Sequence, residues 1–182
     1  MTRRFGRWHV LFVAMTVLSL AVAAQEERSL EKLPNFHQVT ENLYRGAQPQ
    51  PGGLKKLSEL GIKTVVNLRG ASDDTRKEQA EAEASGMRYF NIPMSSLRRP
   101  TDEQVERALA IIDARENWPV FVHCQRGADR TGVIIAVYRI SHEQWTDEQA
   151  IAEAKRFGLA GLQFGKKNYI SDYYKRRRDA QK

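Results

Sequence analysis

The chain has a single cysteine, Cys124, among its 182 residues. One cysteine cannot close an internal disulfide, and it has no second thiol with which to form a redox pair. His9, His37 and His142 have no partners at the spacing of metal ligands, so neither a metal site nor a cofactor is expected. The sequence also shows no internal repeat and no long linker. A lone thiol of this kind is either a small buried hydrophobe or a reactive group.

The first 24 residues follow the plan of a secretory signal. Three arginines among the first seven residues precede an uncharged apolar stretch at 10–24, which ends in small residues. This stretch has 15 residues, fewer than the roughly 20 that a membrane-spanning helix needs. We therefore expect a signal peptide at 1–24, cleaved after Ala23 or Ala24, and an exported protein, which in a bacterium means the periplasm. The alternative is an uncleaved membrane anchor.

The remaining residues suffice for one domain. We expect a flexible segment at 25–35, the domain at 36–178 and a tail at 179–182. Without the three N-terminal arginines, 26 basic residues face 22 acidic ones, so the net charge falls from +7 to +4. The basic residues are not interleaved with aromatic ones, so nucleic-acid binding is not expected. We expect a monomer that contacts a membrane only through an uncleaved signal segment.

Apolar runs alternate with amphipathic stretches through this domain. Strands are predicted at 36–39, 43–45, 63–68, 87–94 and 120–124, and helices at 53–60, 73–85, 101–116, 130–140, 146–157 and 167–177. The β-branched run at 133–138 resembles a strand by propensity, but the glycine-containing loop before it requires a helix. The order predicts a single-domain α/β fold with a mostly parallel central sheet flanked by helices.

The most informative string is His-Cys-Gln-Arg-Gly-Ala-Asp-Arg-Thr-Gly at residues 123–132. An apolar strand leads into Cys124 and a helix follows the tight loop. In such a loop the backbone N–H groups of Gln125, Arg126, Gly127 and Ala128 point inward as a phosphate-binding nest at a helix N-terminus. The same field stabilises a thiolate, so Cys124 is predicted to be an ionised nucleophile.

Two side chains complete this arrangement. Arg130 carries a planar guanidinium that binds two phosphate oxygens at once and remains on them as charge spreads in the transition state. Thr131 places a hydroxyl where it can donate to the sulfur and help it to leave.

At this point the chain resembles the protein tyrosine phosphatase superfamily, in its dual-specificity branch, whose signature is His-Cys, five residues, Arg, then Ser or Thr. The string Leu-Tyr-Arg-Gly-Ala-Gln-Pro at 43–49 resembles an opening found in bacterial and fungal members of that branch. The resemblance implies a cysteine-based phosphatase fold and two-step phosphomonoester hydrolysis through a cysteinyl-phosphate, without a metal.

The general acid is where the chain departs from the family pattern. The family places an aspartate about thirty residues before the cysteine, but residues 90–99 contain no carboxylate. One candidate is Asp129, because repulsion by bound phosphate favours the protonated form of a carboxyl, and some bacterial members resemble this arrangement. The second is Asp102, which has the alternative role of complementing a helix N-terminus.

The substrate is a phosphorylated protein or a small phosphate ester. Arg126, with the nearby pairs at 98–99 and 166–167, favours a substrate with more than one negative group, such as an inositol phosphate or a phosphoinositide. Two readings from other classes are an anion-binding module without turnover and a thiol redox or sulfur-transfer protein. The latter lacks a partner cysteine and has no use for Arg130.

Overall fold

Residues 31–180 are described by a computed structural model. The predicted signal peptide at 1–24 and most of the predicted flexible segment lie outside these residues. Among the helices of residues 31–180, none is both long and apolar enough to cross a membrane.

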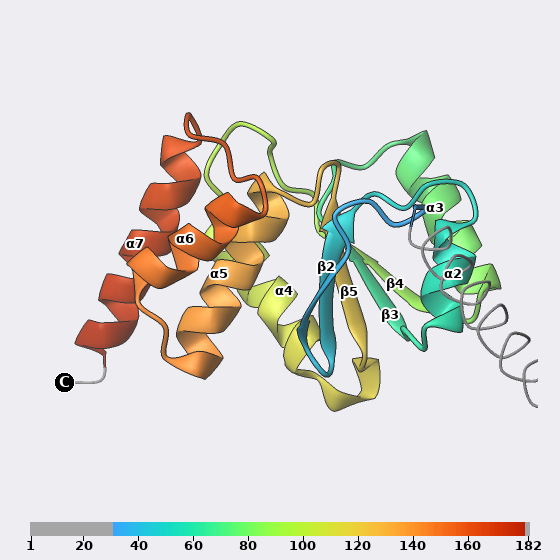
Figure 1. Ribbon diagram of the computed structural model, residues 1–182, viewed down its shortest axis with the longest axis horizontal. Helices are drawn as coiled ribbons and strands as arrows, with labels where there is room; N and C mark the ends of the chain where they lie inside the picture. The colour runs from blue at the N-terminus through green and yellow to red at the C-terminus, as the bar shows by residue number, and fades with distance from the viewer. Residues whose placement is uncertain (1–30, 181–182) are drawn as a thin grey trace, which may run out of the picture.

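A five-stranded sheet forms the centre of the molecule, in the order β1-β2-β5-β3-β4 (Figure 1). Only β1 runs antiparallel to its neighbour, so the predicted mostly parallel sheet is confirmed. The strands are β1 at His37–Thr40, β2 at Leu43–Ala47, β3 at Thr64–Asn67, β4 at Arg88–Asn91 and β5 at Val120–Cys124.

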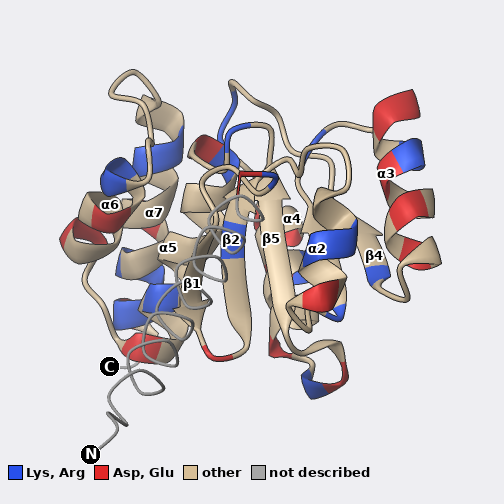
Figure 2. Cartoon of the chain, turned by 45° about the vertical axis from the view of Figure 1, so that its right-hand side comes forward, with Lys and Arg blue, Asp and Glu red and all other residues tan. Residues whose placement is uncertain are grey.

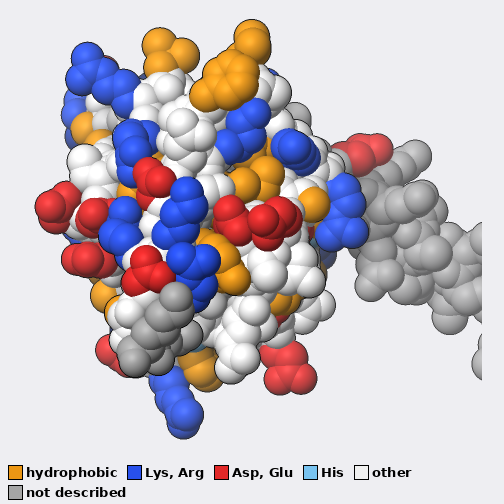
Figure 3. Space-filling model, turned by 90° about the vertical axis from the view of Figure 1, so that its left-hand side faces the viewer, with side chains coloured by type: hydrophobic (Ala, Val, Ile, Leu, Met, Phe, Trp, Pro, Cys, Tyr) orange, Lys and Arg blue, Asp and Glu red, His pale blue; other side chains and the backbone are white. Residues whose placement is uncertain are grey.

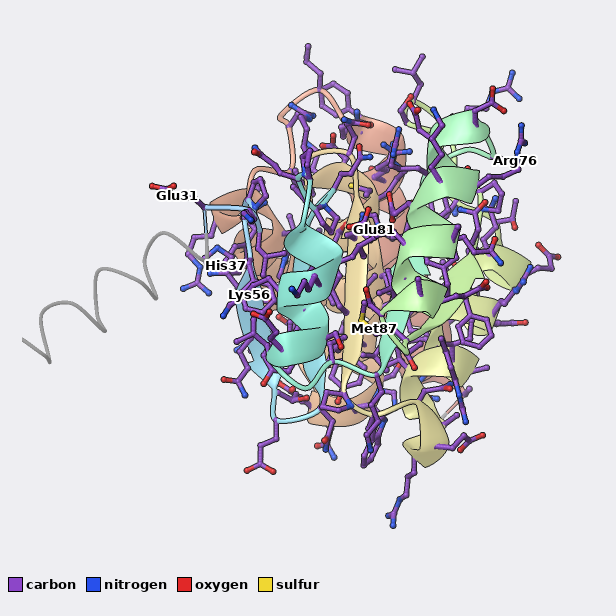
Figure 4. All side chains as sticks on the ribbon, turned by 90° about the vertical axis from the view of Figure 1, so that its right-hand side faces the viewer. Glu31, His37, Lys56, Arg76, Glu81 and Met87 are labelled. Atoms are coloured by element: carbon purple, nitrogen blue, oxygen red, sulfur yellow. The ribbon has the colours of Figure 1, made fainter. Side chains whose placement is uncertain are left out.

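Helices cover both faces of the sheet, as predicted. On one face lie α2 (Gly53–Glu59) and α3 (Asp73–Ala84), which Figure 4 shows in front of the strands. The other face carries α4, α5, α6 and α7 (Figure 1), at Asp102–Asp113, Asp129–Glu143, Asp147–Arg156 and Phe164–Asp179. A 3-10 turn at Arg115–Asn117 leads into β5. The last helix begins three residues earlier than the sequence predicts.

The two faces of the sheet have separate hydrophobic cores. Side chains alternate along a strand, so Val65 and Phe121 face α2 and α3, while Val66 and Val122 face the larger core under the other helices. Nine of the fifteen residues of α5 are buried, because this helix contacts α4, α6 and α7. The β-branched run at 133–138 is therefore a buried helix, as predicted.

Helix caps direct the chain at the start of two other helices. The hydroxyls of Thr101 and Thr146 each accept a hydrogen bond from the backbone N–H of the glutamine three residues later. The side chain of that glutamine in turn accepts a hydrogen bond from the backbone N–H of the threonine. Because β2 to β5 run in parallel, the loops that follow them gather at one edge of the sheet, which is the upper edge in Figure 1. Functional groups at strand ends meet at such an edge.

Residues 31–35 differ from the expected flexible segment. Leu33 is buried in the core beneath α2, and the Pro34 carbonyl accepts a hydrogen bond from the N–H of Ala47 at 2.8 Å. The polar composition of the segment hid this anchoring, since a single buried leucine and a few backbone hydrogen bonds leave no periodic pattern.

Candidate functional site

The cysteine loop (residues 124–130) joins β5 to α5 at the upper edge of the sheet. Cys124 ends the strand with its side chain buried, and Asp129 is the first residue of the helix. Between them Gly127 has a φ of +66°, a conformation that favours glycine. The string at 123–132 therefore forms the strand, loop and helix that its residues predict.

The carbonyl groups of the cysteine loop are held on its outer side by residues distant in the sequence. The Asn35 amide donates to the Arg126 carbonyl at 3.0 Å, and the Arg45 guanidinium donates to the Gly127 carbonyl at 2.8 Å. The Gln125 carbonyl accepts from a backbone N–H of the segment after β2 at 3.4 Å. With the carbonyls turned outward, N–H groups of the loop turn inward, and that of Arg126 donates to the sulfur of Cys124.

The cysteine loop also packs directly on the backbone of β2. A Cβ atom at Gly127 would lie 2.4 Å from the carbonyl of Gly46, and a Cβ at Gly46 would lie 2.7 Å from the Phe121 ring. Neither position has room for a side chain. The strings at 43–49 and 123–132, which the sequence analysis treated separately, are therefore two sides of one contact.

Arg45 is a functional residue that the sequence analysis missed. Its side chain is 1% exposed and its guanidinium lies over the Phe157 ring at 4.2 Å. Burial lowers the pKa of Arg45 to about 10, an effect that Glu153 and Cys124 partly offset. Arg45 thus remains charged at neutral pH and places a buried cation behind the loop. The available signal was an arginine inside a short strand between apolar neighbours.

The surroundings of the Cys124 thiol favour its ionised form. Burial raises the pKa of this thiol. The hydroxyl and N–H of Thr131, the charge of Arg130 and the N–H of Arg126 lower the pKa by more than burial raises it. The net effect is a Cys124 pKa below the ordinary value, which is the condition for a nucleophilic thiolate.

Arg130 extends from the first turn of α5 across the ends of two strands. Its Nη1 atom lies 3.4 Å from the carbonyl oxygen of Leu68 and 3.5 Å from that of Met94. These long contacts orient the guanidinium beside the thiol. The structure thus brings Cys124, Arg130 and Thr131 together at one point.

The two candidate acids occupy different places. Asp129 lies at the cysteine loop, where one carboxylate oxygen pairs with Arg126 at 2.5 Å and the other accepts from the Ala160 N–H at 3.0 Å. Asp102 lies in the first turn of α4 and faces α7, where its carboxylate accepts from the Tyr169 hydroxyl at 2.6 Å and from Arg176 at 2.9 Å.

His123 belongs to a polar cluster beneath the loop. Its side chain is fully buried and stacks on Phe121, and its Nε2 lies 2.7 Å from a carboxylate oxygen of Glu78 on α3. Asn67 donates to the same carboxylate at 3.2 Å. No sequence pattern singled out Glu78, because it lies in a charged stretch that is typical of a surface helix.

A further cation, Lys166 of α7, lies near the thiol. It is 1% exposed, and its ammonium donates to the Ser96 carbonyl at 2.8 Å. Burial lowers the pKa of Lys166, while Asp129, Arg130 and Cys124 also act on it through their charges. Figure 2 shows blue segments on the loops above the sheet in this region. Arg98 is exposed in the loop after β4, whose Met94 carbonyl lies near Arg130.

Tyr44, the neighbour of Arg45 in β2, lies outside the site. Tyr44 stacks on Phe36 at 5.6 Å and packs against the core beneath α2 rather than bordering the loop. Within residues 31–180 no group of three or more His, Cys, Asp or Glu side chains is arranged to hold a metal ion.

Comparison with known proteins gives a consistent result. Residues 15–171 match the family described as "DSP-PTPase phosphatase fused to NAD+ Kinase". The chain is 33% identical over 126 residues to the dual specificity protein phosphatase TpbA of Pseudomonas aeruginosa, covering 69% of this chain and 55% of TpbA. It is 26% identical over 141 residues to the inositol diphosphatase DSP4 of Arabidopsis thaliana, covering 75% of this chain and 70% of DSP4. The chain thus spans about half the length of TpbA.

Solved structures share the fold. A crystal structure of P. aeruginosa TpbA superposes with a TM-score of 0.62 at 27% identity, covering 78% of this chain and 84% of that one. The catalytic core of the PP-IP phosphatase SIW14 from S. cerevisiae, in complex with citrate, gives a TM-score of 0.70 at 24% identity, covering 81% and 92% of the two chains. With the geometry of the cysteine loop, these matches show that the chain belongs to the family of dual-specificity, protein-tyrosine-phosphatase-like phosphatases.

Proposed function

We propose that this chain is a cysteine-dependent phosphomonoester hydrolase. The observation that carries the proposal is the environment of Cys124, a buried thiol at the start of the loop before α5, whose pKa is lowered by the hydroxyl and N–H of Thr131, the charge of Arg130 and the N–H of Arg126. The same donors that stabilise a thiolate fit a phosphoryl group, whose oxygens carry charge through the transition state. A non-catalytic anion-binding module needs no ionised sulfur.

In the first step the Cys124 thiolate attacks phosphorus and the bond to the ester oxygen breaks. Loop N–H groups and Arg130 hold the three equatorial oxygens, and the leaving oxygen takes a proton from a general acid. The products are a cysteinyl-phosphate and the free alcohol or phenol. No redox change and no metal enters this step.

In the second step water attacks the cysteinyl-phosphate and the sulfur leaves as a thiolate. The Thr131 hydroxyl, which already lowers the pKa of Cys124, stabilises the departing sulfur. The carboxylate left by the general acid accepts the proton of the attacking water. Inorganic phosphate then dissociates and the thiolate is restored.

Asp129 is the general acid of this proposal, with Asp102 as the alternative. Asp129 is 8% exposed and adjoins Arg130, whereas the side-chain hydrogen bonds of Asp102 lead to Tyr169 and Arg176 of α7. Asp129 becomes available when a substrate phosphate draws Arg126 away from it, since the two compete for one guanidinium. The anchoring bond from Ala160 keeps the carboxyl in place during that exchange.

The proposed substrates are phosphorylated proteins, with an inositol phosphate or phosphoinositide as a second candidate. TpbA is named a dual specificity protein phosphatase and DSP4 an inositol diphosphatase. The observation that favours the second candidate is Lys166, a buried cation in the field of Arg130 that a single phosphoryl group in the loop does not require. Its charge favours a substrate that carries a second anionic group.

Replacing Cys124 with serine will abolish hydrolysis of an aryl phosphate, by a factor on the order of 10⁴ or more, because the hydroxyl is not ionised by the loop. The assay uses full-length protein expressed for export and recovered from the periplasmic fraction, where its intact mass also reports whether residues 1–24 have been removed. Retained activity in Cys124→Ser would exclude the cysteinyl-phosphate route.

Thr131→Val will shift the ionisation of Cys124 upward. Since the Thr131 hydroxyl lowers the pKa of this thiol, alkylation by iodoacetamide against pH will show a midpoint below that of a free thiol in the wild type and a higher one in the variant. Thr64→Val is the matched control, because Thr64 has a buried hydroxyl at the far end of β3. Equal midpoints in the two variants would contradict the assigned role.

Asp129→Asn will slow hydrolysis of an alkyl phosphate by about 10² to 10⁴, and that of p-nitrophenyl phosphate much less, because a good leaving group needs little protonation. Asp102→Asn, measured in parallel, will leave the ratio of the two rates unchanged. The reverse pattern would assign the acid to Asp102.

Lys166→Met will raise KM for an inositol polyphosphate about tenfold, because one positive charge near the loop is lost and a substrate with several negative groups is attracted less. KM for p-nitrophenyl phosphate will change little, and kcat for both substrates is followed alongside. A parallel increase for the two substrates would remove the argument for a second anionic group.

A further inference from the structure

Two loops border the cysteine loop and contact each other. Residues 93–101 follow β4, and residues 157–168 join α6 to the first turn of α7. The first loop meets Arg130 through the Met94 carbonyl, and the second meets Asp129 through the Ala160 N–H. The Gln163 amide joins the two by donating to the Ser96 carbonyl at 3.3 Å. We call these two segments the rim.

The rim exposes large apolar side chains that the fold does not use. Leu97 is 82% exposed, Leu162 is 85% exposed and Phe164 is 61% exposed. The fourth large hydrophobic of this kind in residues 31–180 is Leu60, 43% exposed beside α2. Figure 3 shows hydrophobic side chains projecting from the upper end of the molecule, with Lys and Arg close below them. Exposed apolar groups gathered at one end of a protein mark an interaction surface.

The charge of the rim has one sign. Neither of its two segments contains an aspartate or a glutamate, but together they hold Arg98, Arg99, Lys166 and Lys167. Arg99 is paired with Asp172 at 3.2 Å and Lys166 is buried, so Arg98 and Lys167 are the cations nearest the apolar tips. The Lys167 ammonium lies 4.6 Å from the centre of the Phe164 ring. Apolar and cationic groups therefore alternate on the same surface.

The shape of the rim favours a lipid bilayer over a peptide as its binding partner. Peptides bind in grooves that receive their side chains, whereas these apolar side chains project outward. Hollows of about 670 and 320 Å³ do occur on the described surface, but they are lined by residues such as Trp118 and Trp145, away from the rim. Projecting apolar groups beside cations match the boundary between acyl chains and anionic headgroups.

We propose that the rim docks on an anionic lipid bilayer. Leu97, Leu162 and Phe164 enter the outer acyl region, while Arg98 and Lys167 contact headgroup phosphates. In this orientation the cysteine loop faces the headgroup layer, where it meets phosphate esters of lipids or of proteins held at the membrane. The inference goes beyond the hydrolase activity, because docking requires no turnover.

The test uses the single cysteine of the chain. In the full-length Cys124→Ser protein, Leu97→Cys provides one thiol for an environment-sensitive fluorophore such as NBD, and Leu60→Cys provides the matched control on α2. Each protein is mixed with vesicles of phosphatidylglycerol and phosphatidylcholine in equal parts, or of phosphatidylcholine alone. If residues 10–24 tether the chain, they do so in both proteins, so the difference between the two labels reports the rim.

The label at position 97 will shift to the blue and brighten about twofold with the anionic vesicles, because it leaves water for the acyl boundary. The label at position 60 will not respond. Adding Arg98→Glu and Lys167→Glu will weaken the response of position 97 at least about tenfold in lipid concentration, and Lys77→Glu on α3 will leave it unchanged. High salt will also weaken it, because screening shortens the reach of surface charges.

Three results would overturn the proposal. The labels at 97 and 60 could respond alike, phosphatidylcholine alone could give the full response, or a phosphotyrosine peptide could shift label 97 when vesicles do not. The last result would assign the rim to a protein partner. The labelled proteins carry Cys124→Ser and have no nucleophilic thiol. Their vesicle binding is therefore tested independently of hydrolysis by the wild type.

Discussion

The site depends on how β2 holds the cysteine loop. Asn35 and Arg45 take the outward carbonyls of Arg126 and Gly127, so the peptide units between them cannot turn over and their N–H groups stay on the side of the sulfur. The rigidity of such a nest depends on the donors that bind its outward carbonyls, because an isolated loop satisfies these carbonyls with water in many conformations. The parallel pairing of β2 with β5 places Arg45 beside the loop, and Asn35 comes from the segment before β1.

Charge balance around the thiol follows from that arrangement. Arg130, Lys166 and Arg45, which is buried against the outward carbonyl of Gly127, each interact with Cys124 through their charge. Buried cations near one another are costly unless an anion is shared among them. Glu153 acts on Arg45 and Asp129 acts on Lys166, and the Cys124 thiolate is a further anion near both cations. A phosphoryl group adds more negative charge when substrate binds. Nucleophile and substrate are thus stabilised by the same set of groups.

The parts of the site that are local in sequence were predictable, and the parts that arise from distant contacts were not. Cys124, Arg130 and Thr131 fall within one string whose glycines and flanking runs determine its shape. Arg45 lies 82 residues from the carbonyl it holds, and Asn35 lies 91 residues from its own. Their roles appear only once the order of the strands is known. For Asp102 the helix cap was readable from the sequence, but the pairing with α7 required the tertiary packing.

The contact between Gly46 and Gly127 has an evolutionary consequence. Neither glycine has space for a methyl group, and the Phe121 ring closes the third side. A substitution at any of these three positions would require simultaneous substitutions at the other two, and no residue is smaller than glycine. A related protein could retain the cysteine but carry a larger residue in place of either glycine. Such a protein would still be recognisable as a relative, but it would have lost its activity. The two glycine positions therefore distinguish active from inactive relatives better than the cysteine does.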